Sequence, residues 1–366
     1  MRVEDERMMR RALRLSVCGL RTCAPNPAVG CVIAKDGRIV GEGFHARAGE
    51  AHAEVLALAT AGESARDATV YVTLEPCTHQ GRTPPCAPAL IAAGVRRVVA
   101  ATQDPNPRVA GTGLDALRAA GIEVEVGVCE TFARRINRGF FSRFERSRPW
   151  LTLKIAASLD GKSALGDGTS RWITGPIARA AVHRSRARAG AILTGVGTVL
   201  ADDPALDVRL PGVKRQPLRV VLDSQLRTPP TARLFASGGA VHIFCVEADS
   251  KHRLALEKAG ATIHCIGADA DGRVETAAVL RTLAELEVNE VYGECGPRLA
   301  GTLIAGGWAD ELELFLGPHF LGAGARPFAM LGDLAVIPDA PEWRTVFARR
   351  AGRDVRIRLR PQHLPE

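Results

Sequence analysis

The chain has 366 residues, of which 46% are hydrophobic and 24% are charged, as in a soluble globular protein large enough for two domains. No run of about 18 apolar residues occurs, so no membrane span is predicted. The first seven residues carry both acidic and basic groups, which indicates neither a signal peptide nor a transit peptide. Nine cysteines do not suggest a disulfide framework, and we expect a reducing, cytoplasmic location.

The formal net charge of +8 raises nucleic acid as a partner, but the arginines are scattered along the chain. Only 5% of the residues are aromatic, which leaves little material for stacking platforms that bind single strands. A small anionic substrate explains the charge equally well. We therefore expect no nucleic acid and no membrane as partners.

The first 147 residues alternate predicted helices and strands. An amphipathic helix is predicted at the N-terminus, with Met9, Leu13, Val17 and Leu20 on its apolar face. Residues 29–34 and 39–44 flank an Asp-Gly turn and predict a hairpin. The further predicted elements are strands at 68–74, 95–101 and 122–126, and helices that begin at residues 52 and 86 and near 112.

A second alternation of strands and helices begins at Trp150, just after Pro149, which cannot continue the preceding helix. This pattern predicts a second α/β domain with a largely parallel sheet, so we expect one domain over 1–147 and another over 148–366. Its strands are predicted near residues 151–156, 191–196, 218–222, 241–246, 262–266, 289–293 and 311–316, with a terminal strand at 355–360.

The most informative motif is His52-Ala-Glu54, followed by Pro-Cys77 and then by Cys86. Zinc is held well by nitrogen and sulfur, and a catalytic zinc keeps three protein ligands and one open position. His-x-Glu followed by Pro-Cys-x-x-Cys is the signature of zinc-dependent base deaminases, although here eight residues separate the two cysteines. We predict one zinc ion on His52, Cys77 and Cys86, with Glu54 as the proton carrier.

Three other functions share parts of this pattern. A nucleic-acid-editing deaminase would have the same zinc motif, and a reductase could keep a deaminase half with a purely structural role. A structural zinc module is the third, with His79 as a fourth ligand. Near the motif, Asn26, His45 and His79 are candidates for substrate contacts, and each is equally plausible as an ordinary loop residue. Arg82 is the better candidate for a phosphate contact, because arginine can bind phosphate oxygens bidentately.

The second half lacks a dinucleotide fingerprint, because Gly195-Val-Gly197 has no third glycine at the required spacing. Residues 294–302 follow a predicted strand and open a helix whose free N–H groups would suit a phosphate. A basic cluster at residues 179–188 is predicted on one helix, as a solvated face or as a site for a phosphorylated substrate. These residues alone predict a nucleotide or phosphate site.

Taken together, the motifs resemble the bifunctional deaminase/reductase family of riboflavin biosynthesis, from about residue 5 to about residue 330. That family has the same eight-residue interval between its zinc cysteines. The segments that carry the resemblance are 25–30, 51–54, 75–86, 154–161, 170–174, 198–206, 222–224 and 294–302.

The resemblance implies an α/β fold with a cytidine-deaminase-like three-layer domain followed by a dihydrofolate-reductase-like domain. It implies zinc-dependent hydrolytic deamination of 2,5-diamino-6-(5-phosphoribosylamino)pyrimidin-4(3H)-one. NADPH-dependent reduction of the ribosyl group to a ribityl chain follows, giving 5-amino-6-(5-phosphoribitylamino)uracil. The implied cofactors are one zinc ion per chain and NADPH, and the partner is a small phosphorylated pyrimidine. Association into a homo-oligomer is left open.

For the reduction, the resemblance implies two sets of contacts. Lys154 and Asp202 are the polar groups expected near the reaction centre. The residues expected to bind NADPH are Ala156, Trp172, Thr198, Asp202, Ser224, Gly296, Pro297, Arg298, Leu299, Ala300, Gly301 and Thr302. The residues expected to bind the substrate are Ser170, Arg186, Leu206, Arg209 and Glu294.

Overall fold

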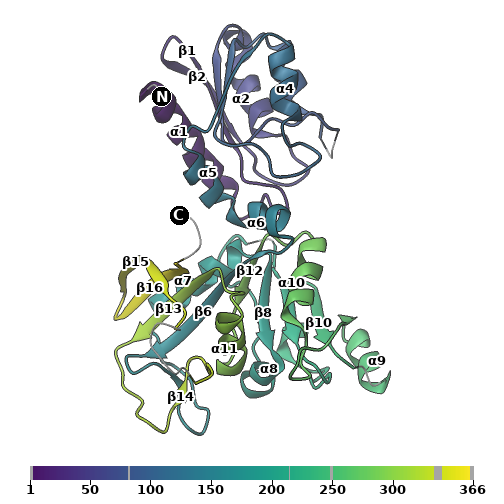
Figure 1. Cartoon of the computed structure of the whole chain (residues 1–366), viewed down its shortest axis with the longest axis vertical. Coiled ribbons are helices and arrows are strands. Elements are labelled where there is room, and N and C mark those ends of the chain that lie inside the picture. The colour runs from purple at the N-terminus through teal and green to yellow at the C-terminus, as the bar shows by residue number, and fades with distance from the viewer. Residues whose placement is uncertain (1–2, 81–82, 214, 248–249, 334–339, 363–366) are drawn as a thin grey trace. The chain divides into compact units, whose positions relative to one another are not determined.

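Two structural units follow one another along the chain, and the division falls between Ser147 and Arg148 (Figure 1). The computed structural model describes residues 3–80, 83–213, 215–247, 250–333 and 340–362. Each unit has its own β-sheet and its own hydrophobic cores. Among the helices in these ranges, none combines the length and the apolar character needed to cross a bilayer.

The N-terminal unit contains a five-stranded sheet in the order β2-β1-β3-β4-β5. β1 pairs antiparallel with β2 and β3, whereas β3, β4 and β5 run parallel. The predicted hairpin is confirmed, and Asp36 and Gly37 at its turn have φ of 52° and 75°, as a type I′ turn requires. The strands are β1 (Gly30–Lys35), β2 (Arg38–Phe44), β3 (Thr69–Val72), β4 (Arg97–Ala100) and β5 (Glu123–Val126).

Helices cover both faces of this sheet, which makes the N-terminal unit a three-layer α/β/α structure (Figure 1). Successive side chains of a strand point to opposite faces. Ile33 and Val70 therefore pack under α2, α3 and α4, whereas Val32 and Tyr71 pack under α1 and α5. The helices are α1 (Val3–Gly19), α2 (Ala53–Ala61), α3 (Cys86–Ala92), α4 (Thr112–Ala119), α5 (Glu130–Ile136) and α6 (Arg138–Arg146), with a 3-10 turn η1 (Gly62–Ala65).

The buried face of α1 differs from the prediction. Met9 and Leu13 are buried, but Val17 is 49% exposed and Leu20 lies beyond the end of the helix. The buried stripe runs through residues 5, 8, 9, 12, 13 and 16, and at 3.6 residues per turn position 17 is rotated out of it. The stripe includes Asp5, which accepts hydrogen bonds from Tyr71 and Arg97.

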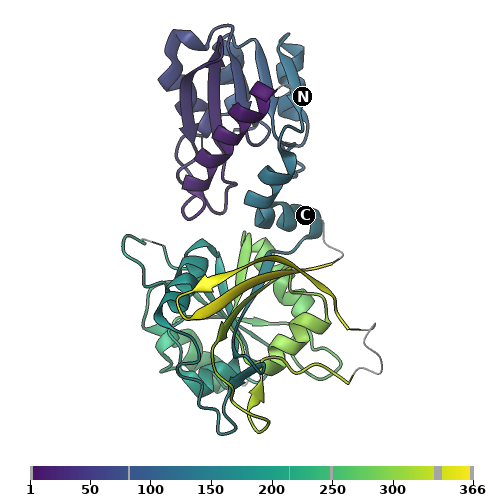
Figure 2. The same cartoon turned by 90° about the vertical axis from the view of Figure 1, so that its left-hand side faces the viewer.

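The C-terminal unit contains a nine-stranded sheet in the order β11-β10-β9-β8-β12-β6-β13-β16-β15. The strands from β11 to β13 run parallel, and β16 is antiparallel to both β13 and β15. Figure 2 shows the β15–β16 hairpin in yellow. The strands are β6 (Trp150–Ser158), β8 (Ala191–Gly195), β9 (Leu218–Leu222), β10 (Val241–Cys245), β11 (Ala261–Cys265), β12 (Glu290–Gly293), β13 (Glu311–Gly317), β15 (Trp343–Ala351) and β16 (Asp354–Pro361).

All seven strands predicted between Trp150 and β13 are present, as is the terminal strand. The predicted parallel arrangement is confirmed. β15 and a small pair formed by β7 (Lys162–Ala164) and β14 (Arg326–Pro327) were not predicted. Helices again cover both faces, α10 and α11 on one and α7, α8 and α9 on the other. They are α7 (Pro176–Arg188), α8 (Val196–Asp202), α9 (Ser250–Lys258), α10 (Thr276–Glu285) and α11 (Pro297–Ala305), with a 3-10 turn η2 (Arg233–Phe235).

Candidate active sites

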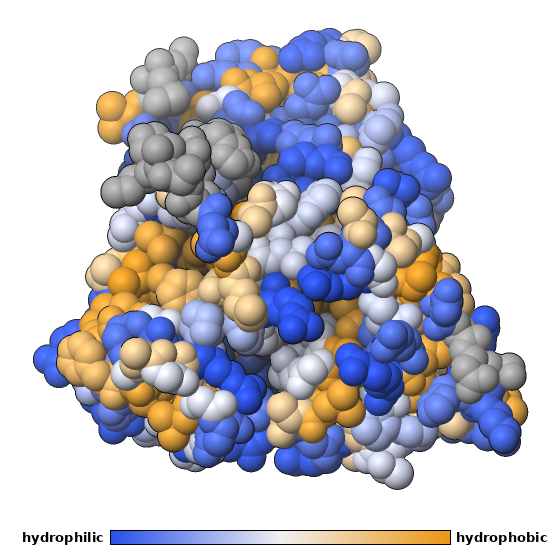
Figure 3. Space-filling model, turned by 60° about the horizontal axis from the view of Figure 1, so that its bottom comes forward, coloured by the Kyte–Doolittle hydropathy of each residue, from blue (hydrophilic) through white to orange (hydrophobic). Residues whose placement is uncertain are grey.

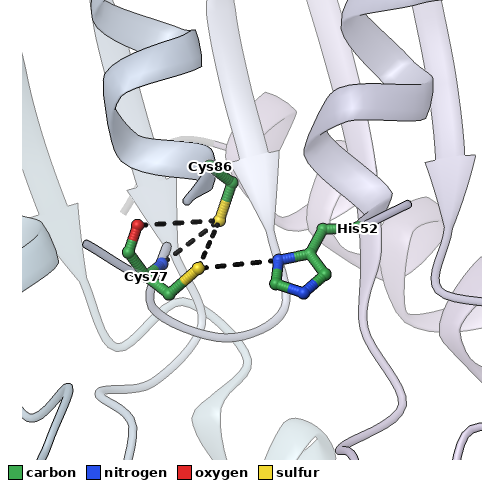
Figure 4. A group of neighbouring side chains, drawn as sticks. All are labelled: His52, Cys77 and Cys86. Carbon is green, nitrogen blue, oxygen red and sulfur yellow. Dashed lines mark hydrogen bonds between the residues drawn. The ribbon is translucent and has the colours of Figure 1, made fainter. Parts of the chain in front are cut away.

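The three predicted zinc ligands of the N-terminal unit lie together. His52 is the residue before α2, Cys77 lies in the loop after β3, and Cys86 is the first residue of α3. The Cys77 Sγ is 3.3 Å from the Cys86 Sγ and 3.5 Å from the His52 Nδ1 (Figure 4). All three ligand atoms lie within 4.8 Å of one another.

These separations fit zinc. Bonds of about 2.3 Å to sulfur and about 2.1 Å to nitrogen place the corners of a zinc tetrahedron roughly 3.6–3.8 Å apart. The distances from the Cys77 Sγ to the other two ligand atoms are slightly shorter, and all three atoms lie within 4.8 Å of one another, so small movements of the side chains would admit the ion. Of the residues that the structure describes, His52, Cys77 and Cys86 are the one group of this kind, which leaves a fourth position open.

The electrostatic surroundings of the cluster favour a thiolate at Cys77 and raise the pKa of two other groups, the Glu54 carboxyl and the Cys86 thiol, the latter chiefly through its hydrogen bond with Cys77. Glu54, in the first turn of α2, is only 3% exposed, and this burial raises the pKa of its carboxyl group. The hydrogen bond with the Cys86 thiol, with a further contribution from His52, lowers the pKa of Cys77. The backbone N–H of Cys77 also donates to the Cys86 Sγ over 3.2 Å.

The other predicted residues near this site have different positions. The buried His45 ring lies 5.4 Å from the His52 ring, and its Nε2 is 3.1 Å from the Asn26 Nδ2. Asn26 and His45 therefore lie beside the cluster. His79 is exposed and is not part of the three-ligand group, so the structure lends no support to a fourth protein ligand there. Arg82 lies outside the described residues.

A cavity of 1660 Å³ lies in the C-terminal unit. Its walls include residues at or just after the ends of β8, β9 and β12, at the carboxyl ends of the strands, where open α/β sheets bind ligands. The face of the molecule drawn in Figure 3 is hollowed near its centre, with blue, hydrophilic residues at the margins of the hollow.

Most of the residues predicted to bind NADPH or substrate line this cavity. Ala300 and Gly301 do not, because both lie on the buried face of α11. A Cβ atom at Gly301 would lie 1.8 Å from the Met330 carbonyl oxygen, so this glycine permits close packing. The cavity-lining residues of the NADPH set are Ala156, Trp172, Thr198, Asp202, Ser224, Gly296, Pro297, Arg298, Leu299 and Thr302. The cavity-lining residues of the substrate set are Ser170, Arg186, Leu206, Arg209 and Glu294.

Glu294, in the cavity wall, forms ion pairs with two cationic side chains. The Arg186 Nε lies 2.5 Å from the Glu294 Oε1, and the Lys154 Nζ is 4.0 Å from the Glu294 Oε2. Burial raises the pKa of Glu294, but Arg186 and Lys154 outweigh it and keep the pKa below its ordinary value. Glu294 is therefore an ionised carboxylate in a site that also holds two cations.

The basic residues of α7 are not a uniformly solvated face. Arg179, His183 and Arg186 line the cavity, whereas Arg188 forms an ion pair with Glu290. The guanidinium of Arg179 lies 4.3 Å from the centre of the Trp172 ring. Arg179 and His183 belong to the basic cluster that the sequence left as either a solvated face or a site for a phosphorylated substrate, and both lie in the cavity wall. Their spacing of three and four residues from one another and from Arg186 marks one helical face and was the available signal.

The fold and the cluster define the class of the first unit as a zinc-dependent deaminase, joined here to an α/β unit with a cavity for a charged ligand. Family models agree. Residues 2–102 match the cytidine and deoxycytidylate deaminase zinc-binding region, and residues 149–357 match the RibD C-terminal domain.

Relatives match this chain over nearly its whole length. It is 45% identical to the riboflavin biosynthesis protein RibD of Escherichia coli strain K12, over 98% of this chain and 99% of the relative. The RibD structure of Acinetobacter baumannii matches with a TM-score of 0.91 and 40% identity, over 98% of this chain and 99% of that one. A Thermotoga maritima structure matches with a TM-score of 0.85 and 34% identity, over the same shares. The chain belongs to the RibD family of riboflavin biosynthesis proteins.

Membership of this family confirms the fold class and the general activity predicted from the sequence. The chain is a bifunctional enzyme of riboflavin biosynthesis, with a deaminase domain and a reductase domain. Its cofactors are zinc, for which the His-Cys-Cys cluster is suited, and NADPH. Its substrate is a small pyrimidine.

Proposed function

We propose that the chain deaminates 2,5-diamino-6-(5-phosphoribosylamino)pyrimidin-4(3H)-one and then reduces the product to 5-amino-6-(5-phosphoribitylamino)uracil. The observation that carries this proposal is the open three-ligand cluster in the same chain as a cavity lined by most of the residues predicted to bind NADPH and by all those predicted to bind the substrate. The Thermotoga maritima relative is a diaminohydroxyphosphoribosylaminopyrimidine deaminase and 5-amino-6-(5-phosphoribosylamino)uracil reductase, which supports the order of the two steps.

In the first step, we propose that His52, Cys77 and Cys86 hold the zinc ion. Zinc, when bound, acts as a Lewis acid that activates water toward the amino-bearing carbon of the ring. Glu54 takes a proton at a carboxylate oxygen and returns it to the substrate, so that water replaces the amino group and ammonia leaves. Its burial suits this role, because a raised pKa allows the carboxyl group to hold the proton between the two transfers.

In the second step, we propose that the cavity of the C-terminal unit binds NADPH and the deaminated product together. NADPH supplies the hydride that reduces C1′ of the sugar, and the protein supplies orientation and charge. The cationic Arg186 and Arg209 suit a phosphorylated substrate, and Arg186 is itself held by Glu294. We place Lys154 and Asp202, which also line the cavity, near the reacting sugar.

We also propose the kind of partner that the chain binds and the compartment in which it acts. We propose no nucleic-acid partner, because the chain has few aromatic residues and its cavity-lining cations surround a site for a small anion. All nine cysteines are unpaired, and two of them are needed as thiolate ligands, which favours the reducing cytoplasm.

Both activities can be tested on the purified chain by measuring zinc content, ammonia release and NADPH oxidation. The diaminopyrimidine nucleotide and a single-stranded RNA serve as alternative substrates. We expect about one zinc per chain, ammonia from the nucleotide alone, and NADPH oxidation that follows deamination. Zinc without either activity would refute the proposed function, and ammonia from RNA alone would assign the first unit to nucleic-acid editing.

A further inference from the structure

The two ring nitrogens of the zinc ligand His52 face different partners. Its Nδ1 is directed at the Cys77 Sγ over 3.5 Å, and its Nε2 lies 3.0 Å from the hydroxyl oxygen of Thr83. Figure 4 shows Nδ1 aimed at Cys77 while the other ring nitrogen points away from both sulfur atoms. Nδ1 is therefore the nitrogen on the metal side.

This arrangement sets the protonation of the ring. A neutral imidazole that offers the lone pair of Nδ1 to a metal carries its proton on Nε2. The Thr83 hydroxyl oxygen is then the acceptor of that Nε2–H. His52 makes no capping hydrogen bond to α2 through its side chain, so the helix start does not hold the ring by that means. We infer that Thr83 is a positioning residue that holds His52 in the zinc-binding tautomer and orientation.

The inference also accounts for the long interval between the two cysteines. Thr83 is six residues after Cys77 and three before Cys86. In the Cys-x-x-Cys spacing, no intervening residue is more than two positions from either cysteine. The eight-residue interval provides a residue that can reach the opposite side of the His52 ring.

Residues that accept a hydrogen bond from a metal-binding histidine have measurable effects on the metal site. A group that accepts the second N–H of a ligating histidine fixes the ring and raises its basicity, and its loss typically costs 10–100-fold in metal affinity or activity. Replacement of the hydroxyl by a methyl group would leave the N–H without its acceptor. The inference rests on the zinc site of the proposed function and adds a residue that stabilises it.

The same segment offers a matched control. Thr78 also lies between the two cysteines, but its hydroxyl is 2.9 Å from the Thr112 hydroxyl and, among the described residues, forms no hydrogen bond with His52. Thr83→Val, Thr83→Ser and Thr78→Val would be prepared as full-length zinc-loaded proteins. We would measure the rate at which each transfers zinc to a coloured chelator, and the visible spectrum of each protein with cobalt in place of zinc.

We expect Thr83→Val to release zinc about 10–100-fold faster than the wild type and to shift the cobalt spectrum. Thr83→Ser and Thr78→Val should behave as the wild type, and NADPH oxidation with the deaminated intermediate should be unchanged in all three. Release at the wild-type rate from Thr83→Val, or equal acceleration in Thr78→Val, would overturn the inference and leave the zinc site standing. A wild-type protein that binds no zinc would instead refute the proposed function.

Discussion

Glu54 offers the sharpest test of the proposed deamination. Its side chain is 3% exposed and lies two residues from the proposed zinc ligand His52. Glu54→Gln preserves the size of the side chain and its hydrogen-bonding reach, but an amide cannot take up and return a proton. The substitution therefore removes the proposed chemistry while it leaves the packing of α2 in place.

The expected loss follows from the role of the group. A positioned general acid–base typically contributes 10²–10⁴-fold, which at about 1.4 kcal/mol per factor of ten is roughly 3–6 kcal/mol of transition-state stabilisation. The thermal midpoint should not fall, because a neutral amide in this buried position avoids the cost of burying a charge. Zinc content should stay at about one per chain, since all three ligands remain.

The assay compares ammonia release, zinc content and NADPH oxidation in the wild type, Glu54→Gln and Glu63→Gln. Glu63 is an exposed acid just after α2, so its replacement controls for the loss of a carboxylate in the same region. NADPH oxidation with the deaminated intermediate should be equal in all three proteins. Deamination within about threefold of the wild type in zinc-loaded Glu54→Gln would refute the assignment of Glu54 as proton carrier.

Three further predictions concern the C-terminal unit. Glu294→Ala leaves the guanidinium of Arg186 buried without its carboxylate and should lower the unfolding free energy by about 3–5 kcal/mol, measured by denaturant titration. Burial raises the pKa of the buried Glu313, but Arg358 and Arg356 outweigh it and lower that pKa. Its stabilising effect is thus present above pH ~4.3 and lost as the pH falls through the folded value. The difference in unfolding free energy between Glu313→Gln and the wild type should therefore shrink in acid. His183→Ala removes the acceptor of a 3.2 Å hydrogen bond from a backbone N–H in the cavity wall, and should raise KM for the reduction about fivefold, measured by steady-state kinetics.

Those strands that carry continuous apolar or β-branched runs were predictable from the sequence. One core of the C-terminal unit contains Leu151, Leu153 and Val220, and each belongs to a run of apolar residues that predicts a buried strand. β15 was missed because its residues include several arginines, which favour a solvated segment. Its partner β16 brings Arg356 and Arg360 against Glu313 and Glu311, so ion pairs hold this part of the sheet together.

The zinc site was predictable for a different reason. The side-chain types that zinc prefers can be recognised in a sequence without knowledge of the fold, and this applies to His52, Cys77 and Cys86. The contacts in the 294–302 segment depend instead on helical geometry. Because successive residues of a helix point in different directions, α11 turns Pro297 and Arg298 toward the cavity and Ala300 away from it.

The burial of Asp5 could not be predicted from the sequence of its own helix. An acidic residue in the first turn of a helix is favoured there by the helix dipole and is expected to face water. In the structure it is 1% exposed, because Arg97 of β4 and the hydroxyl of Tyr71 of β3 both donate hydrogen bonds to its Oδ1. The two donors lie 66 and 92 residues away, so the burial of Asp5 follows only from the packing of α1 on the sheet. Arg97 compensates the buried charge of this carboxylate, so replacing either partner of the pair would strongly destabilise the fold.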